Sequence, residues 1–507
     1  MKIYAYAASG YAGQLVSVEV DIRRGIPGLD IVGLPDNAVR ESRERVRIAI
    51  SRSGFEFPKQ RILVNLSPAD LKKEGAAYDL PIAVGILAAS NQLPLISGND
   101  ILCIGELLLD GSIRSVSGVL PAVAAAKNHG VNRFIVPAMN LPEALTLACK
   151  TAFGIAALQE LVPALEQPQN LLPETVLVQE EASSSCEDIS ELRGQPILKR
   201  GLEICAAGGH HLIVFGPPGS GKTMGIRTLP GLLPDLSPER ALEVTRIWSQ
   251  SGSLGERKGL IYRPPFREPH HTATSEGLVG GAAGKPGEVS LAHGGILFLD
   301  EAPEFGGRVL QSLREPLESG RIDLARAGRK WWYPADFQLV MAMNPCPCGN
   351  LGREEASCLC TAPEISRYWR RIGGALMDRV DIRVPVSPVD PQALLEPPGE
   401  DSRTVRERVN LARDMQLRRY HNCLWSINAD IPPGELRKVV KLDDTSAIYF
   451  TEAVRKLGLS SRAAHGVLRV ARSIADLSGR SDVDTDDILE AVQHRRLGDR
   501  DLYWTTL

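Results

Sequence analysis

The sequence predicts an α/β protein whose central part forms a mostly parallel sheet covered by helices on both faces. Between residues 195 and 386, short apolar runs of strand character alternate with helical segments, which is typical of such a sheet. Another α/β segment precedes this part. Beyond Pro388 the chain is helical almost throughout, because 404–419 and 463–477 repeat their apolar residues with the 3.6-residue period of packed helices.

Size and composition are those of a soluble multidomain protein. The chain has 507 residues, which predicts about three domains, and 43% of them are hydrophobic and 23% charged. No apolar run approaches the ~18 residues that span a bilayer, and residues 1–13 lack the features of a secretion signal. We therefore expect a cytoplasmic protein without a membrane partner. The net charge of −3 neither indicates nor excludes nucleic acid, so local basic patches must decide that question.

Composition changes sharply at one place, which divides the chain. Residues 166–187 are rich in Gln, Pro, Glu and Ser without core periodicity, and they are interpreted as an interdomain linker. We expect a first domain over 1–165, a central domain over 188–388 and a helical domain over 389–507. Strands and helices of the first domain are predicted at 16–22, 61–66, 82–89 and 120–128.

A phosphate-binding loop opens the central domain. A short apolar strand, 212–215, runs into a complete GxxxxGK[ST] pattern that precedes a helix. Glycines let backbone N–H groups converge on phosphates, the lysine reaches the β- and γ-phosphates of ATP, and the threonine hydroxyl is a ligand for Mg²⁺. The alternative is a chance match in a Gly/Pro-rich turn, which the strand and helix on either side disfavour. The loop consists of Gly216, Pro217, Pro218, Gly219, Ser220, Gly221, Lys222 and Thr223.

Two further strand ends carry residues that suit the chemistry of hydrolysis. The apolar run 295–299 ends in Asp300 and Glu301, which predicts a carboxylate for the Mg²⁺ shell and another that polarises the attacking water. The run 338–343 ends at Asn344, whose amide would sense the γ-phosphate or hold the same water. Alone, Asn344 would be an ordinary turn residue, and its order after the other two elements favours the sensing role.

Arginines are expected to complete the site. In oligomeric motors a neighbouring subunit supplies positive charge on the γ-phosphate side as an arginine finger. Arg379 is the candidate finger, and Arg462 is the candidate sensor that reaches the nucleotide of its own subunit from the helical domain. Arg469 and Arg472 fall on the same predicted helix, and a surface salt bridge is the alternative for both candidates.

Several long and uncommon runs characterise this chain. They are Gly33-Leu34-Pro35-Asp36 within 32–46, Arg267-Glu268-Pro269-His270-His271, the stretch 285–293, the stretch 313–318 and the stretch 343–349. With these runs, the whole chain resembles the ComM/YifB family of magnesium-chelatase-like AAA+ ATPases. The resemblance implies a P-loop AAA+ core followed by a helical lid. It also implies a hexameric ring, an insertion in the second helix, a hairpin before the sensor strand, and homology with the ATPase subunit of magnesium chelatase. The family's best-described role is ATP-dependent branch migration of DNA in natural transformation.

The first domain resembles the proteolytic domain of Lon, yet it lacks that enzyme's catalytic pair. The nucleophile of Lon lies in a run that corresponds to residues 73–79, where Ala77 occupies the serine position. The partner lysine is also missing from the matching stretch 117–121. A Ser–Lys mechanism needs both groups, so we expect a non-proteolytic domain, either an assembly surface or a DNA-facing collar.

The predicted hairpin concentrates cations and aromatics at residues 326–333. In related motors this hairpin enters the pore, where cations meet phosphates and rings stack on bases. Arg326, Arg329 and Lys330 are therefore candidate DNA contacts. Its aromatic residues have an equally good alternative as core residues.

Four of the nine cysteines lie within one short stretch after Asn344. Cys346, Cys348, Cys358 and Cys360 form a CxC…CxC pattern, and four thiolates would close a tetrahedral structural zinc site. CxC is less diagnostic than CxxC. The remaining cysteines are scattered, which indicates reduced thiols. His270 and His271 have no carboxylate partner that the sequence identifies, so they receive no role.

The sequence thus predicts a homo-oligomeric ATP hydrolase that acts on single-stranded or branched DNA as a branch-migration helicase. A chelatase-type or protein-remodelling ATPase is the alternative. The linker, the additional first domain and the basic hairpin favour the DNA motor.

Overall fold

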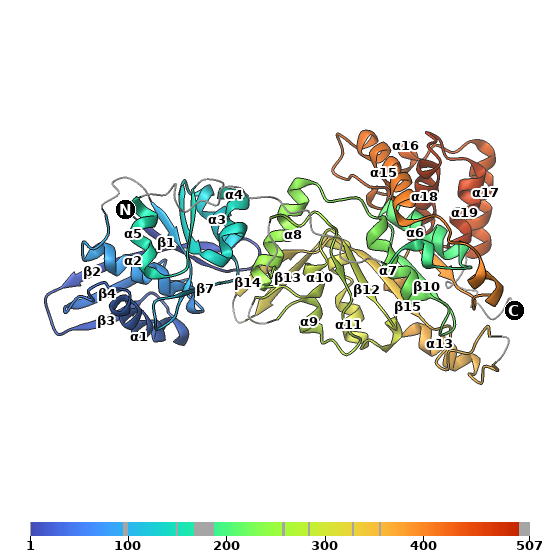
Figure 1. Cartoon of the computed structure of the whole chain (residues 1–507). Helices are drawn as coiled ribbons and strands as arrows, with labels where there is room; N and C mark the ends of the chain where they lie inside the picture. Colours follow the sequence, from blue (N-terminus) through green and yellow to red (C-terminus); the bar gives the residue numbers. More distant parts are fainter. Residues whose placement is uncertain are drawn as a thin grey trace.

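The computed structural model describes residues 2–94, 100–148, 151–166, 187–255, 259–281, 284–326, 329–353 and 356–495. Residues 167–186 of the expected linker lie outside this range. The first α/β domain lies at one end of the molecule, the central α/β domain follows, and the C-terminal helices cover one side of the central domain (Figure 1). The predicted α/β class with a parallel central sheet is confirmed.

The first domain is built on a mixed seven-stranded sheet of order β3-β4-β2-β1-β5-β8-β9. All four elements predicted from the sequence are present, within β2, β4, α2 and α3. The strands are β1 Ile3–Ala7, β2 Gln14–Arg23, β3 Gly28–Val32, β4 Arg61–Ser67, β5 Ile101–Cys103, β8 Arg133–Pro137 and β9 Ala152–Ile155. The helices are α1 Asn37–Arg52, α2 Asp79–Ala89, α3 Val119–Asn128, α4 Leu141–Ala148 and α5 Leu161–Glu166.

The central domain holds a five-stranded, wholly parallel sheet of order β11-β12-β15-β10-β16. Its strands are β10 Leu212–Phe215, β11 Phe266–Arg267, β12 Ile296–Leu299, β15 Gln338–Met343 and β16 Ile382–Pro385. A separate antiparallel hairpin is formed by β13 Arg321–Arg326 and β14 Arg329–Pro334. The helices are α6 Pro196–Gly208, α7 Lys222–Leu232, α8 Pro238–Ser251, α9 Ser275–Val279, α10 Glu288–Leu291, α11 Gly307–Ser312, α12 Pro316–Ser319, α13 Ala362–Arg370 and α14 Gly374–Met377.

Alternate residues of the central strands enter two different hydrophobic cores. Leu212 and Val214 pack with α6 and α7 on one face, whereas Ile213 and Phe215 pack with α10, α11 and α13 on the other. This is the period-2 pattern of a strand buried on both faces. Each fully buried aliphatic side chain contributes about 1.5–3 kcal/mol to such a core, so the sheet provides a rigid support for the loops at its two edges.

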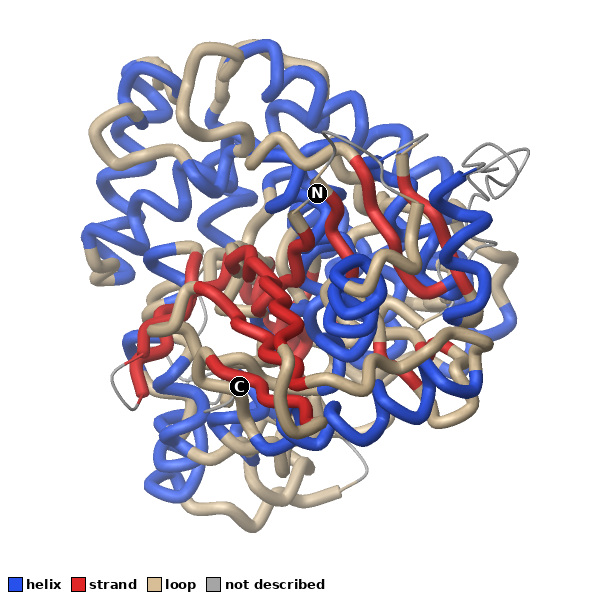
Figure 2. Tube along the Cα trace, turned by 90° about the vertical axis from the view of Figure 1, so that its left-hand side faces the viewer, coloured by secondary structure: helices blue, strands red, loops and turns tan. Residues whose placement is uncertain are grey.

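The C-terminal helices share a core with the central domain. Val405 and Val409 of α15, together with Val467 and Val470 of α18, belong to the same buried cluster as β10 and β16. Figure 2 shows this upper part of the molecule as helices and connecting loops. None of the helices in the described ranges is long and apolar enough to cross a membrane. The elements are α15 Ser402–Arg419, α16 Leu436–Val439, α17 Asp444–Leu457, α18 Ser461–Leu477 and α19 Thr485–Gln493.

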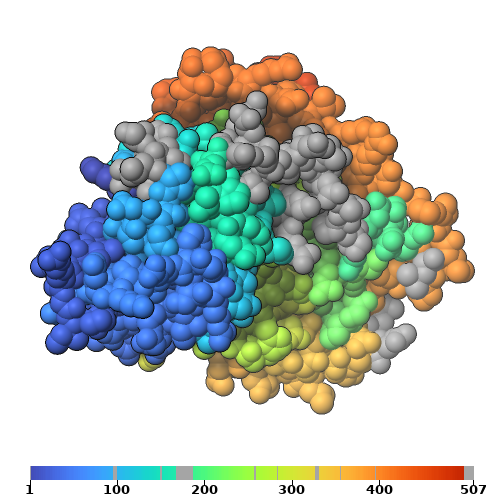
Figure 3. Space-filling model, turned by 60° about the vertical axis from the view of Figure 1, so that its left-hand side comes forward, coloured from blue at the N-terminus to red at the C-terminus, as the bar shows by residue number. Residues whose placement is uncertain are grey.

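The first domain contacts the central domain directly (Figure 3). The buried Glu143 accepts a hydrogen bond from Leu120 N and another from Ser249 Oγ at the end of α8, and Gly118 N donates to Ser249 O over 3.0 Å. Gln250 Nε2 donates to Gly10 O over 2.5 Å. Burial raises the pKa of Glu143, and these hydrogen bonds oppose that rise. The hydrogen bonds of Glu143, Gly118 and Gly10 therefore attach the first domain to α8.

Candidate nucleotide site

The phosphate-binding loop lies between the end of β10 and the start of α7. Gly219 and Gly221 have left-handed φ values of 78° and 82°, which favour glycine. A Cβ atom on Gly216 would lie 2.2 Å from Val386 O, so that position has no room for a side chain. The glycines of the sequence pattern therefore meet real backbone requirements, and α7 directs its N-terminus toward the loop.

Lys222 is held inside the loop. Its Nζ donates to Gly216 O over 2.7 Å and to Pro217 O over 2.8 Å, and it lies 3.3 Å from Asn344 Oδ1. Burial lowers the pKa of Lys222 to about 8, while the negative charges of Asp300 and Glu301 oppose the change. An ammonium group in this position is ready to exchange carbonyl partners for phosphate oxygens.

Thr223, in the first turn of α7, contacts Asp300, which directly follows β12. Thr223 Oγ1 donates to Asp300 Oδ2 over 2.9 Å, and Glu301 N donates to Asp300 Oδ1 over 2.9 Å. A hydroxyl and a carboxylate oxygen are hard donors of the kind that Mg²⁺ takes alongside phosphate oxygens and water. The residues present therefore fit the magnesium ion expected from the sequence.

Glu301 adopts a strained conformation beside a histidine. Its φ of 51° and ψ of 44° are left-handed values that cost a residue other than glycine about 1–3 kcal/mol. The side chain is exposed, and Oε2 lies 3.5 Å from Nδ1 of His271. Sequence reasoning missed this carboxylate partner of His271, because the two residues are brought together only by the fold. Strain of this kind is typical of functional positions, where it fixes a side chain that acts on a ligand.

Asn344 completes one edge of the sheet. The loop follows β10, Asp300 follows β12 and Asn344 follows β15, and these three strands are neighbours. The carboxyl ends of parallel strands meet at the same edge, which is where α/β sheets bind ligands. The structure thus brings together Lys222, Thr223, Asp300 and Asn344, with Glu301 next to them.

Arg379 and Arg462 lie together at a different place. Arg379 lies three residues before the first residue of β16; it is largely buried and pairs with Glu318 of α12 and with Ala375 O. Arg462 Nη1 lies 3.6 Å from Oε1 of the same Glu318. Burial, reinforced by the charges of Arg462 and Arg314, lowers the pKa of Arg379 to about 10, so it remains charged at neutral pH.

Neighbouring arginines on α18 have structural partners. Arg469 donates to Ile431 O over 3.0 Å, and the buried Arg472 pairs with Asp476 over 2.9 Å. Ser460 caps the start of α18 by accepting a hydrogen bond from Ala463 N. Arg462, in the first turn after this cap, is half exposed. The structure therefore separates Arg462 from the two arginines that were its competitors.

Arg462 was expected to reach the nucleotide of its own subunit, but the structure places it away from the phosphate-binding loop. A groove of about 1380 Å³ is lined by both arginines and by His211, Gly295 and Gln338. These three residues lie at the start of β10, β12 and β15, so the groove follows the amino edge of the sheet. The four residues of β10 alone, at about 3.3 Å each, separate the edges by about 13 Å. The helices that carry Arg462 pack behind the sheet, and this packing places it at the edge opposite the loop.

Two aromatic residues of the hairpin make intramolecular contacts, although Trp332 remains 42% exposed. Tyr333 is buried, with its hydroxyl donating to Gly284 O, and Trp332 lies 5.2 Å from the ring of Tyr11 in the first domain. Tyr11 N also donates to Trp332 O over 3.0 Å. Lys330 is exposed. The side chains of Arg326 and Arg329 lie outside the described part of the structure.

The Lon-like position in the first domain contains no nucleophile. Ala77 lies in a short 3₁₀ turn, and the following Asp79 is buried against Arg45, whose Nε donates to it over 2.8 Å. The carboxylate of Asp79 therefore links this turn to α1. Ala77 O accepts a hydrogen bond from Gly105 N over 3.1 Å.

Comparisons with known proteins cover nearly the whole chain. The family model described as magnesium chelatase, subunit ChlI, matches residues 188–394, a second model of this subunit matches 18–140, and its C-terminal model matches 399–495. YifB of Escherichia coli is 42% identical over 98% of this chain and 97% of its own. Competence protein ComM of Haemophilus influenzae is 41% identical over 98% of this chain and 97% of its own.

The chain belongs to the magnesium-chelatase-like AAA+ family that contains ComM and YifB. Lon protease 2 of Bacillus subtilis is 25% identical over 145 residues, a quarter of this chain, in agreement with a Lon-like first domain. Membership of an AAA+ family implies ATP and Mg²⁺ as ligands, which suits the geometry of the loop and of the Thr223–Asp300 pair.

Proposed function

We propose that this protein is a ring-forming ATP hydrolase that uses the energy of hydrolysis to move branched or single-stranded DNA. The observation that carries the proposal is that the candidate residues for hydrolysis lie at two opposite edges of a single sheet. A second subunit that presents its amino edge to the carboxyl edge of the first would complete each site. Repetition of that head-to-tail contact closes a ring, and a hexamer is the state that the family resemblance implies.

Each residue of the site has a definite role in the proposed reaction. Thr223 and Asp300 would hold Mg²⁺, which would neutralise charge on the triphosphate. Lys222 binds phosphate oxygens, and Glu301 orients the attacking water and accepts its proton. Asn344 holds that water or the γ-phosphate. Arg379 of the neighbouring subunit neutralises the charge that develops in the transition state. Water and ATP are consumed, and ADP and inorganic phosphate are released.

We assign Arg462 to the same side as Arg379. Both guanidinium groups contact Glu318 and both residues line the same groove, so a partner that enters this groove would meet both. In the free chain Glu318 neutralises part of their charge. A triphosphate that approaches this edge is a stronger partner than one carboxylate, because it carries more negative charge.

Two observations support DNA as the substrate. The exposed Lys330 lies on a hairpin that is held in place by the contact of Trp332 with Tyr11 and by the hydrogen bond of Tyr333 to Gly284 O. The full-length similarity to a competence protein favours a role in the handling of incoming DNA. A chelatase-type or protein-remodelling activity is the alternative that the names of the three family models favour.

The test is the rate of ATP hydrolysis with no DNA, with single-stranded DNA and with a forked duplex, followed by strand exchange on a four-way junction. We expect stimulation by DNA and junction movement that requires ATP. Lys330→Ala should weaken DNA binding and reduce its salt dependence by about one phosphate contact, whereas Lys441→Ala, an exposed lysine elsewhere, should change neither. Indifference to both DNAs, with stimulation by a protein client, would establish the alternative.

A further inference from the structure

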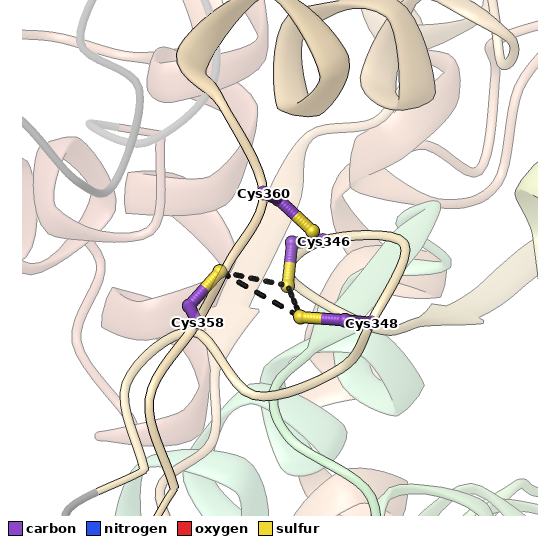
Figure 4. Close-up of side chains that lie close together, drawn as sticks. All are labelled: Cys346, Cys348, Cys358 and Cys360. Carbon is purple, nitrogen blue, oxygen red and sulfur yellow. Dashed lines mark hydrogen bonds between the residues drawn. The ribbon is translucent and has the colours of Figure 1, made fainter.

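Four thiols converge beside the nucleotide site. Cys346 and Cys348 follow Asn344 directly, whereas Cys358 and Cys360 return from the far side of the same loop (Figure 4). All four Sγ atoms lie within 4.8 Å of one another. Cys346 Sγ is 3.4 Å from Cys348 Sγ and 3.6 Å from Cys358 Sγ, and the last two are 3.7 Å apart. Three sulfurs at nearly equal spacing, with a fourth no more than 4.8 Å from any of them, form the donor arrangement of a metal site.

The spacing fits zinc and excludes disulfides. A disulfide would bring two sulfurs to about 2.05 Å, and all four cysteines are free. A tetrahedral Zn²⁺ ion with Zn–S bonds of about 2.3 Å holds its sulfurs about 3.8 Å apart. Cys346 is buried, Cys348 is exposed and the other two are intermediate, so one side of the cluster faces water and permits entry of an ion.

Backbone groups also contact the sulfurs of the cluster. The main chain of Leu351 hydrogen-bonds to the sulfur of Cys346, and that of Asn350 to the sulfur of Cys348. The sulfurs of Cys358 and Cys360 receive similar bonds from Cys360 and Cys348. Hydrogen bonds to ligating sulfurs orient metal ligands.

The same loop packs against the parts of the site that read the γ-phosphate. A Cβ on Gly349 would lie 2.9 Å from Cγ of Pro218, so the cysteine loop is in close contact with the phosphate-binding loop. Pro345, between Asn344 and Cys346, accepts a hydrogen bond from Trp369 Nε1 over 3.0 Å. The ring of Trp369 meets Phe215, the last residue before the loop, edge-on at 5.2 Å. One contact network thus joins the cluster, Asn344 and the loop.

We propose that Cys346, Cys348, Cys358 and Cys360 bind one structural zinc ion, and that this ion fixes Asn344 and Pro218 in the positions that ATP turnover requires. Four thiols lose their protons to solvent when the ion binds, and four Zn–S bonds then restrain the loop. Without the ion, nothing joins the two CxC pairs covalently. The segment after β15 then loses its restraint, and with it the support of Asn344. The second half of the proposal rests on the proposed hydrolysis of ATP.

The first measurement is the metal content of the purified full-length chain by mass spectrometry. We expect about one zinc per chain in the wild type and in Cys423→Ser, the control, which changes an exposed cysteine outside the cluster. Cys348→Ser/Cys360→Ser should contain little or none. This pair leaves the buried Cys346 in place, which protects the fold. A wild type without metal, or one that holds iron instead of zinc, would overturn the metal site.

The second measurement tests the coupling without relying on mutation. A strong chelator removes zinc from the wild type, and added zinc restores it. Hydrogen–deuterium exchange should rise on removal in peptides that cover 215–223 and 339–350, with no change in the first-domain sheet. ATP turnover should fall about ten- to hundredfold, as expected when catalytic groups shift by about 1 Å, and should recover with zinc.

The outcomes separate the two proposals. Unchanged exchange and turnover after complete zinc removal would overturn the coupling and leave the motor intact. A zinc-loaded wild type that never hydrolyses ATP would overturn the proposed function, while metal content and exchange would still decide the zinc site and its contact with the loop.

Discussion

The two edges of the central sheet differ in what each of them lacks. The carboxyl edge carries the phosphate-binding loop, Asn344, and Thr223 with Asp300, which we call the magnesium pair. Among the described contacts, Lys222 is the one cation that contacts the loop and Asn344. The amino edge carries Arg379 and Arg462, held by Glu318 beside a groove of about 1380 Å³. In the proposed reaction, each edge has the groups that the other needs. A parallel sheet cannot bend to join its own edges, so this difference supports the proposal that the site is completed between subunits.

Replacement of Arg379, the proposed arginine finger, should have the largest effect on ATP turnover. Arg379→Ala leaves the loop and the magnesium pair intact, so ATP should still bind while turnover falls about 10³-fold or more, the scale of an arginine finger. Steady-state phosphate release and nucleotide affinity would be measured together. Arg403→Ala, an exposed arginine on α15, is the control and should change neither. Full turnover in Arg379→Ala would remove this residue from the site.

Removal of the base should give a similar phenotype from the opposite edge. Glu301→Gln keeps the size of the side chain but cannot accept the proton of water, so turnover should fall about 10²–10⁴-fold with ATP binding retained. Lys222→Ala should abolish hydrolysis by loss of phosphate binding. His271→Ala tests whether the contact with Glu301 orients the base, and we expect a smaller loss in kcat than in Glu301→Gln. Normal hydrolysis by the glutamine variant would assign the base elsewhere.

Arg462 should affect turnover in the same direction as Arg379, because both residues lie at the amino edge. Arg462→Ala should lower turnover about ten- to hundredfold through loss of one charge at the transition state, and Arg462→Lys should recover part of it. Glu318→Gln keeps both arginines and removes only their resting partner, so its effect should be smaller than that of either arginine variant. An Arg462→Ala protein whose turnover matches the wild type would show that α18 takes no part in the reaction.

The carboxyl edge should also show a pH dependence that the amino edge lacks. Lys222 has a pKa of about 8, so it loses its charge as pH rises through that value. A bound triphosphate favours the charged form, and binding above pH 8 must therefore take up a proton. We expect ATP affinity to stay nearly constant below this pH and to weaken by at most about tenfold per unit above it. Titration calorimetry would measure this slope, and Lys222→Arg, which stays charged throughout, should lack it.

Local motifs predicted the carboxyl edge well, and tertiary packing decided the rest. The loop, Asp300 and Asn344 are each fixed by the strand that precedes them, so sequence order sufficed to place them together. Arg462 depends on how α18 packs behind the sheet, and no local pattern encodes that packing. The contact of His271 with Glu301 and the use of Trp332 against Tyr11 likewise join segments far apart in sequence. The four cysteines were an intermediate case, because proximity in sequence limited where their sulfurs could lie.

Subunit mixing tests the shared site most directly. Lys222→Ala has an intact amino edge, and Arg379→Ala has an intact carboxyl edge, so each protein alone should be inactive. Mixed rings contain interfaces at which the loop of an Arg379→Ala subunit meets the arginines of a Lys222→Ala subunit, and ATP turnover should return in the mixture. The recovery should depend on protein concentration. A mixture that stays as inactive as its components although the subunits co-assemble, or an Arg379→Ala protein that hydrolyses ATP at full rate as a monomer, would contradict a site shared between subunits.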